Sequence, residues 1–420
     1  MRISTTQLYD SGANGLLRNQ YDLYKLQNQF STGRRVVTPA DDPVAASQAL
    51  VTEQKLNVNQ QFLDNQGNAR AQLAELESLM ASVGTSLIDV KSRWVEAGNG
   101  AYSDSELKAI AVDLRSKFQE FLGIANSADA NGLYRFAGYQ GATQPFVQEG
   151  GQVQYKGDSG ARQLQVEASR FMEVSYSGRQ FFEAIPEGNG VFVTGADTGN
   201  TGSGVISNGS VLTAYSGNNY RLEFTRTPDP LYPTDTTKDT VEYSIYEWAP
   251  GAAMPGTPTS GPFAYKSGDA IFLPDPTDPT KELNVVITGD PATNDSFTLR
   301  PSATESLFTT LDTFIQTLEQ GNKSDPAAFQ NAMLRIGASI DQGIQHVLDG
   351  RADVGARMAE LDSLSALGGD LDVQYQSQIS DLVDLDYTKA ITDLSRNLLQ
   401  LQAAQQSFMK VTGLSLFNFL

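Results

Sequence analysis

Proline distribution limits where this chain can be helical. Of its 17 prolines, only Pro39, Pro43 and Pro326 lie outside the stretch from Pro145 to Pro301. A proline removes a backbone hydrogen bond and collides with the preceding turn, so long helices avoid it. The two flanks can therefore form long helices, and the middle cannot. We predict an α+β multidomain fold in which residues 143–301 form an inserted all-β domain.

The middle of the chain has the pattern of short strands. Runs rich in β-branched and aromatic residues are separated by Gly, Pro, Asn and Asp, which favour turns. The predicted strands are QVQYKGD, RQLQVEA, NYRLEFTRT, TVEYSIYEW, ELNVVITGD and DSFTLRP.

The flanks repeat apolar residues at helical spacing. A helix should begin at SDSE, because Ser103 and Glu106 can form a capping box. The same signal at SATE predicts another helix start at Ser302, and a further apolar stripe runs from Phe329 to Val347. One stripe advances by alternating steps of four and three residues, the spacing of a coiled-coil seam. Its members are Ala69, Leu73, Leu76, Met80, Val83, Leu87, Val90 and Trp94.

The two ends of the chain carry stripes of the same spacing, so we expect them to pair as a long coiled-coil core. The alternative is an ordinary pair of helices inside one globule. The predicted contact residues are Leu16, Leu23, Leu26, Phe30, Ile391, Leu394, Leu398, Leu401, Phe408, Val411, Leu414, Phe417, Phe419 and Leu420.

The last fourteen residues, SFMKVTGLSLFNFL, hold eight large apolar side chains and one charge, Lys410. Burying eight such side chains stabilises by about 12–24 kcal/mol, at about 1.5–3 kcal/mol each. Fixing fourteen backbone residues costs about 14–28 kcal/mol. The tail should therefore need a partner surface in order to be stably folded.

Composition argues against several classes of function. The net charge is −19 without a cluster of Lys and Arg, which disfavours nucleic acid and anionic membranes as partners. Cysteine is absent and His346 is the only histidine, so we predict no metal, no cofactor and no enzyme activity. The first residues lack the apolar core of a cleaved signal peptide, and no run of about 18 apolar residues could span a bilayer. A ligand-binding or enzymatic role for residues 143–301 stays open as a minor alternative.

The stretch QFSTGRRVVTPADDPVAAS follows the first predicted helix. Gly33 suits a helix end, Asp42 can cap the next helix, and Pro43 fits its first turn. This turn-and-cap chemistry accounts for the residue types and implies no function on its own.

The wider pattern resembles the flagellin family of bacterial flagellar axial proteins. The family has a similar loop after its first helix, and the matching positions here are Gly33, Arg34, Pro39, Asp41, Asp42 and Pro43. Two late stretches are also similar to the family, RADVGARMAELDSL and ISDLVDLDYTKAITDLSRNLLQLQAAQQSFMKVTGLSLFNFL. The resemblance covers about residues 1–142 and 302–420. The opening MRISTTQLYDSG and the loop TPADDPVAAS are more similar to the junction members of the family than to flagellin itself.

The resemblance implies an architecture and a role. Residues 1–44 and 371–420 would form terminal coiled-coil segments of an inner tube, residues 45–142 and 302–370 an α-helical core domain, and residues 143–301 the inserted β domain. The protein would be an extracellular structural adaptor between hook and filament, exported by the flagellar type III system without a cleaved signal peptide. Its partners would be other copies in a ring, a neighbouring hook-associated protein, flagellin and a cytoplasmic export chaperone at the C-terminal segment. The alternative is flagellin, the bulk filament subunit.

Overall fold

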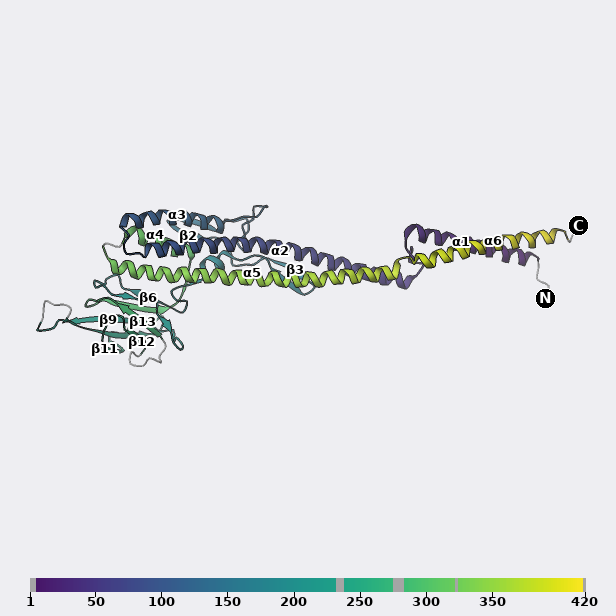
Figure 1. Cartoon of the computed structure of the whole chain (residues 1–420). Coiled ribbons are helices and arrows are strands. Elements are labelled where there is room, and N and C mark those ends of the chain that lie inside the picture. The colour runs from purple at the N-terminus through teal and green to yellow at the C-terminus, as the bar shows by residue number, and fades with distance from the viewer. Residues whose placement is uncertain (1–4, 232–237, 275–282, 322–323, 418–420) are drawn as a thin grey trace. The chain divides into compact units, whose positions relative to one another are not determined.

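The computed structural model describes residues 5–231, 238–274, 283–321 and 324–417 (Figure 1). Helices form both flanks and strands form the middle, so the predicted α+β multidomain class is confirmed. The chain divides into two compact units. The first holds residues 1–67, 166–168 and 361–420, and the second holds residues 68–165 and 169–360. Within the described ranges, no helix is both long enough and apolar enough to cross a lipid bilayer.

The first unit is built from helices at the two ends of the chain. Helix α1 (Thr5–Thr32) packs on α6 (Tyr387–Phe417), and the first part of α2 (Pro43–Ala97) lies against the last part of α5 (Pro326–Val383). In the second pair, Asn59 Nδ2 donates a hydrogen bond to the carbonyl oxygen of Gly368 at 2.8 Å. A Cβ atom on Gly368 would lie 2.7 Å from the Leu63 side chain, so glycine permits this close approach.

The second unit contains the seam predicted along α2. Its residues from Ala69 to Val90 are at most 2% exposed, which confirms the coiled-coil spacing. The stripe predicted along α5 is also buried, from Phe329 to Val347. The two stripes contact each other, since the Trp94 indole N–H donates to the carbonyl oxygen of Met333 at 2.7 Å.

Two further helices complete the helical part of the second unit. Helix α3 (Asp104–Ala125) begins with the predicted capping box of Ser103 and Glu106. Helix α4 (Leu307–Gln320) begins later than predicted, and the capping box at Ser302 is wrong. Glu305 belongs to a short strand, and the Ser306 side chain instead accepts a hydrogen bond from the Phe308 N–H at 3.3 Å.

The middle of the chain forms antiparallel sheets. The larger has the strand order β11-β10-β9-β14-β6, and a second has the order β12-β13-β7 with β8 also paired to β13. All six predicted strands coincide with observed ones, and NYRLEFTRT and TVEYSIYEW match β9 and β10 residue for residue. The bounds are β6 Phe192–Ala196, β7 Val205–Ile206, β8 Ser210–Val211, β9 Asn219–Thr227, β10 Thr240–Trp248, β11 Ser260–Ala264, β12 Ala270–Leu273, β13 Leu283–Thr288 and β14 Ser296–Pro301.

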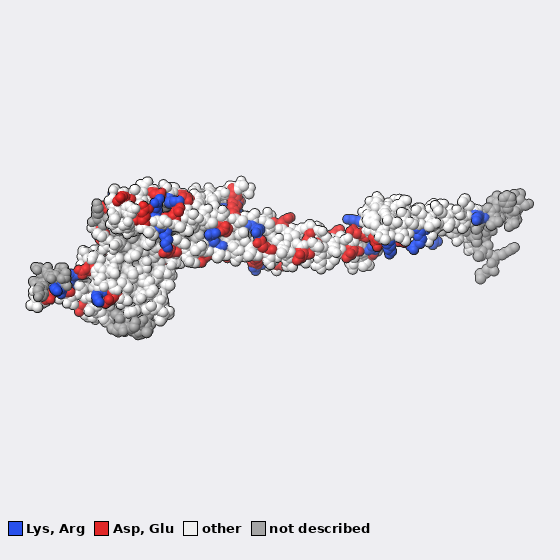
Figure 2. Space-filling view, viewed as in Figure 1, with Lys and Arg blue, Asp and Glu red and all other residues white. Residues whose placement is uncertain are grey.

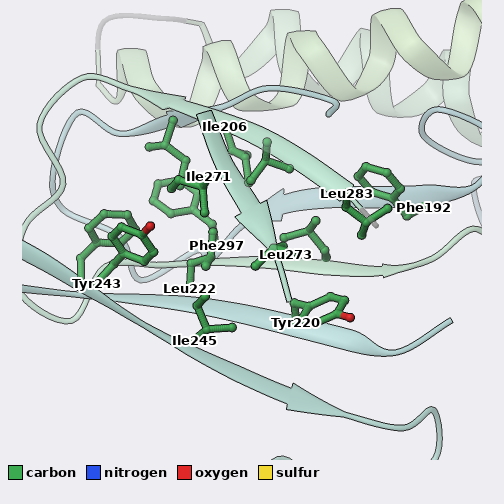
Figure 3. Packing of buried hydrophobic residues seen from close by; sticks show 14 residues of the cluster. Phe192, Ile206, Tyr220, Leu222, Tyr243, Ile245, Ile271, Leu273, Leu283 and Phe297 are labelled. Atoms are coloured by element: carbon green, nitrogen blue, oxygen red, sulfur yellow. The ribbon is translucent and has the colours of Figure 1, made fainter. Parts of the chain in front are cut away.

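The two sheets enclose an apolar core (Figure 3). Along β9 and β13, buried residues alternate with partly exposed ones, as expected of strands that bury one face. Tyr220, Leu222 and Phe297 are fully buried in this core.

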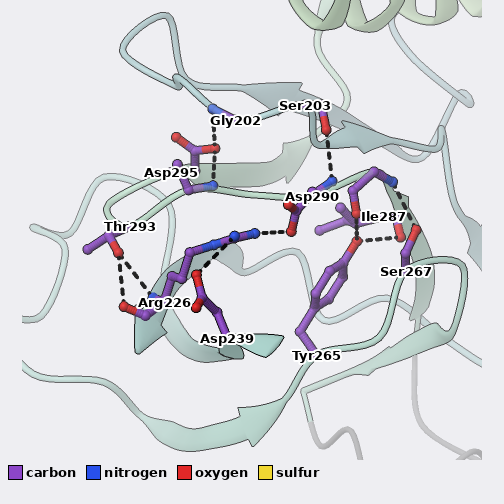
Figure 4. A network of polar contacts seen from close by, with 12 residues as sticks. Gly202, Ser203, Arg226, Asp239, Tyr265, Ser267, Ile287, Asp290, Thr293 and Asp295 are labelled. Atoms are coloured by element: carbon purple, nitrogen blue, oxygen red, sulfur yellow. Dashed lines mark hydrogen bonds and ion pairs between the residues drawn. The ribbon is translucent and has the colours of Figure 1, made fainter. Parts of the chain in front are cut away.

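Polar side chains hold together the loops at one end of these sheets (Figure 4). The buried Asp295 carboxylate accepts hydrogen bonds from the backbone N–H groups of Thr201, Gly202 and Ala292 at 2.8–2.9 Å. Nearby, Arg226 forms ion pairs with Asp239 and Asp290. These contacts fix three loops that carry few apolar residues.

The segment before β6 packs on the helices of the second unit. The ring centroid of Phe308, on α4, lies 5.2 Å from that of Phe146 and 5.7 Å from that of Phe182. Residues 146–186 therefore contribute to the helical core, whereas residues 192–301 have a core of their own. The elements are β1 Phe146–Glu149, β2 Gln152–Tyr155, β3 Gln163–Glu167, β4 Arg170–Glu173, a π-helical turn η1 Arg179–Glu183, β5 Ile185–Pro186 and, later, β15 Thr304–Glu305.

Candidate assembly surface

Helices α1 and α6 form an antiparallel pair, here called the terminal pair. The Tyr9 ring lies 5.2 Å from the Phe408 ring at one end, and Phe30 lies 5.9 Å from Tyr387 at the other. At Gly12 the helices are so close that a Cβ atom would lie 2.8 Å from the Phe408 ring. Glycine in mid-helix lowers helix stability, and here it makes room for an aromatic side chain.

The structure brings most of the predicted contact residues of the two ends together. Leu16, Leu23, Leu26 and Phe30 are partly buried on α1, as are Leu394, Leu401 and Phe408 on α6. Ile391 and Leu398 are not part of this seam, since they are 55% and 42% exposed. The side chains of Val411, Leu414 and Phe417 and the residues Phe419 and Leu420 lie outside the described part of the chain.

Sequence reasoning missed the small and polar members of the α6 seam. Ala390 is buried, and Asn397 and Ala404 are partly buried, in step with Leu394 and Leu401. The spacing of four and three residues continues through them, but the more apolar Ile391 and Leu398 gave the stronger signal. Helix α6 therefore carries two stripes, one against α1 and one uncovered.

The uncovered stripe of α6 lies beside a similar one on α1. Successive residues of an α-helix are rotated by about 100° around its axis. On each helix the exposed stripe is rotated by about 90–140° from the seam, and the sense of rotation is the same on both helices. In an antiparallel pair such stripes fall on one side. We call this side the outer apolar face. Its members, all at least 42% exposed, are Leu17, Tyr21, Tyr24, Ile391 and Leu398.

Most charged residues of the terminal pair lie elsewhere on its surface, but Asp10, seven residues before Leu17, falls in line with the outer apolar face. By helical spacing, Arg18, Lys389 and Arg396 fall on the side opposite the outer apolar face. In Figure 2 the Lys and Arg atoms of this pair gather mainly along its lower edge, and most of its upper edge is uncharged. The pair is therefore amphipathic as a unit. An exposed apolar face of this kind is typical of an interaction surface.

The loop from Gly33 to Pro43 connects the end of α1 to the end of α5 through hydrogen bonds. Gly33 has φ +67°, a left-handed conformation that favours glycine. Arg34 forms a β-bridge with Asp384, and the Arg35 backbone N–H donates to the carbonyl oxygen of Val383 at 2.7 Å. The Arg35 guanidinium also donates to the carbonyl oxygen of Leu382 at 2.5 Å.

Two aspartates organise the rest of this loop. Asp41 accepts hydrogen bonds from the Thr38 backbone N–H at 2.8 Å and pairs with Lys25 at 2.9 Å. The hydrogen bond from Lys25, followed by that from Thr38, lowers the pKa of Asp41 to about 2. Pro39 lies in the turn between Thr38 and Asp41. In this turn the Thr38 carbonyl oxygen accepts a hydrogen bond from the Asp41 N–H at 2.9 Å.

Asp42 begins the next helix. Its carboxylate accepts from the Ala45 N–H at 3.0 Å, and Pro43 is the first helical residue, as the capping interpretation predicted. This N–H hydrogen bond, followed by the one from Arg35, lowers the pKa of Asp42.

The described residues offer no arrangement typical of catalysis. They contain no group of three His, Asp or Glu side chains placed to hold a metal ion. His346, the single histidine, forms a hydrogen bond with the carbonyl oxygen of Gln180 at 2.9 Å and packs near Phe181. These contacts give His346 a structural role.

Similarity to known proteins extends over the whole chain. Residues 3–141 match the family model described as the bacterial flagellin N-terminal helical region. Flagellar hook-associated protein 3 of Salmonella typhimurium is 26% identical over the whole of this chain and 99% of its own length. Residues 3–141 are therefore similar to the flagellin family, and the whole chain is similar to hook-associated protein 3.

Two further comparisons show how far the similarity to each kind of protein extends. The crystal structure of the flagellar junction protein FlgL from Legionella pneumophila is 26% identical, with a TM-score of 0.67 over 80% of this chain and 100% of that one. Phase 1 flagellin of Salmonella naestved is 27% identical, but over only 31% of this chain and 26% of its own length. The flagellin-family likeness is therefore to hook-associated protein 3 along the full chain and to flagellin in one part.

Proposed function

We propose that this protein is the structural adaptor that joins the hook of a bacterial flagellum to its flagellin filament. The full-length similarity to hook-associated protein 3 carries the proposal, because flagellin matches only a third of the chain. In this role it would act outside the cell, after export through the flagellar type III system.

The outer apolar face supplies the physical reason for assembly. Five large apolar side chains lie exposed on two helices that together bury only one seam. Water disfavours such a surface, and neighbouring subunits would remove it from water. The neighbours would be other copies in a ring, a hook-associated protein on the hook side and flagellin on the filament side. Before export, a cytoplasmic chaperone would cover the C-terminal segment, including Val411, Leu414, Phe417, Phe419 and Leu420.

The inner-tube assignment of residues 1–44 and 371–420 stays a proposal. Under it, the terminal pair lines the axis of a helical assembly. The helices of residues 45–142 and 302–370 would surround that pair. The β domain, predicted as residues 143–301 but with its own core only in residues 192–301, would lie further out.

The test is electron microscopy of cells that lack the gene. We expect hooks without filaments, and monomeric flagellin released into the medium. Expression of the full chain in the same cells should restore the filaments. Normal filaments in the deleted strain would refute the proposal.

Flagellin itself is the alternative, favoured by the match of residues 3–141 to the flagellin N-terminal region. Purified chain separates the two, since a bulk subunit should polymerise alone into long filaments. An adaptor should stay monomeric or stop at short rings under the same conditions.

A further inference from the structure

The seam along α2 changes its phase near residue 66. On both sides of this point the positions that face the seam alternate steps of four and three residues, as in a coiled coil. At Leu63, Gln66 and Ala69 two steps of three follow each other, which changes the local winding of such a helix. The seam-facing positions, all buried or partly buried, are Ala45, Ala49, Thr52, Leu56, Asn59, Leu63, Gln66, Ala69, Leu73 and Leu76.

The seam also changes its chemistry at this point. Thr52, Asn59 and Gln66 occupy one position of the seven-residue repeat and are 9%, 9% and 5% exposed. The next two members of the same repeat, Leu73 and Met80, are fully buried. Amide and hydroxyl groups gain less from burial than the apolar groups of leucine and methionine. Burial therefore stabilises the α2 seam less up to Gln66 than beyond it.

The hydrogen bonds of Gln66 are incomplete. Its side-chain Nε2 donates to the carbonyl oxygen of Val166 at 2.8 Å, whereas its buried Oε1 accepts no hydrogen bond from any residue that the structure describes. A buried acceptor without a partner lowers stability. This cost falls at the point where the seam changes its phase.

The residue after Gln66 is a glycine that packing does not require. A Cβ atom on Gly67 would meet no atom within 4 Å. By contrast, a Cβ atom on Gly368 would lie 2.7 Å from the Leu63 side chain, so that glycine makes room for a neighbour. A glycine within a helix lowers its stability relative to alanine and gives the backbone more conformational freedom. Freedom of the backbone is therefore the physical effect of Gly67.

Helix α5 contains glycines of the same kind in the corresponding region. A Cβ atom on Gly355 or Gly369 would also meet no atom within 4 Å. These two glycines lie on either side of Leu361 in the sequence. The first compact unit ends at Gly67 on α2 and resumes at Leu361 on α5, although both helices continue through these residues.

We propose that residues 63–69 of α2 form a bending joint, at which the helix changes direction reversibly while the turns on both sides stay helical. Helices bend where the backbone is locally freed or weakened. The phase change, the polar seam, the incomplete hydrogen bonds of Gln66 and the open Gly67 all weaken α2 within this one segment. Gly355 and Gly369 allow α5 to follow the bend.

The joint is a property of the single chain and does not depend on the proposed function. Under that function it would let the outer part of each copy move while the terminal pair stays packed among its neighbours.

The absence of cysteine makes a spin-label test clean, because every thiol is an introduced one. Gln54→Cys with Ala74→Cys places two labels at exposed positions of α2 on either side of the joint, about 30 Å apart at about 1.5 Å per residue. Ala74→Cys with Ser92→Cys places two labels on the same side, about 27 Å apart. Pulsed electron paramagnetic resonance of the purified full-length chain gives the distribution of each distance.

We expect a broader distribution for the label pair that spans the joint than for the control pair. Gly67→Ala together with Gly355→Ala and Gly369→Ala should narrow the broader distribution to the width of the control. Gly123→Ala, at an equally open glycine on α3, should leave it unchanged. Amide hydrogen exchange at residues 63–69 should slow about two- to fivefold in the triple variant, the factor expected when alanine replaces one glycine in a helix.

Two outcomes overturn the joint. Equal widths for the two label pairs in the natural sequence would mean that α2 is stiff through Gly67. A broad distribution that the three alanines leave unchanged would mean that these glycines do not cause the bending. Neither result bears on the adaptor function, which the deleted strain tests separately.

Discussion

The substitution Leu398→Asp should weaken assembly of the terminal pair without disturbing its folding. The side chain lies on the outer apolar face, 42% exposed, and α6 contacts α1 through Leu394 and Leu401 instead. In the free protein the new carboxylate can therefore remain in water. In the assembled flagellum it would face an apolar neighbour.

The structure gives the size of the effect. Covering the remaining 42% of a leucine side chain is worth about 0.6–1.3 kcal/mol, given about 1.5–3 kcal/mol for the whole side chain. Burying an unpaired carboxylate at the same place costs several kcal/mol more. Together these exceed about 3 kcal/mol for each contact, which corresponds to at least about a hundredfold weaker binding.

Three measurements on the variant follow from this reasoning. The far-UV circular dichroism of the purified chain should match that of Ala403→Asp, which adds the same charge at an exposed position of α6 away from the outer apolar face. In cells lacking the natural copy, Leu398→Asp should fail to support filaments and Ala403→Asp should support them. The amount of each variant in the medium shows whether export or assembly is affected. Normal filaments with Leu398→Asp, or equal failure of both variants, would refute the role of this face.

Three further predictions concern the loop, the sheets and the insertion. Nuclear magnetic resonance should show the Asp41 carboxyl titrating near pH 2. Its contribution to stability should thus be present above about pH 4 and lost as the pH falls towards 2, and Lys25→Met should raise its pKa towards 3.8. Asp295→Ala should destabilise the sheets by about 2–4 kcal/mol by thermal unfolding, because buried N–H groups lose their acceptor; the exposed Asp269→Ala should have little effect. Replacing residues 192–299 with a short linker should leave export and some filament growth intact. A replacement that starts at residue 146 should instead unfold the helices, and faster digestion by trypsin would show this.

The long helices and strands were predictable because one simple periodicity governed each. The stripe from Ala69 to Val90 is buried without interruption, so its spacing of four and three residues was informative. The alternation in β9 and β10 worked for the same reason. Short strands such as β5 and β15 have two residues each, and a segment that short has no periodicity to detect. The capping signal at Ser302 was wrong because Glu305 pairs in a strand instead.

The candidate surface was harder to predict than the fold. Its residues were recognised as apolar and helical, but sequence alone could not assign Leu398 and Leu401 to different faces. The difference depends on where α1 lies, and α1 is placed by Gly12 and by the ring contacts of Tyr9 and Phe30. Small residues such as Ala390 and Ala404 complete the seam, and their weak hydrophobicity hid them.

The exposed stripes have a simple physical cause. A pair of helices can bury one stripe from each partner, so any second stripe remains in water until a further helix arrives. The terminal pair carries such a second stripe, and Val44, Val51 and Val58 form another on the first part of α2. Covering these stripes within one chain would require a third helix against each pair. The described residues of the first unit form only two pairs, and the loop at Arg34 and Arg35 ties the end of α1 to the end of α5. Under the proposed function, other molecules would supply these helices, and the exposed leucines and valines would then serve assembly.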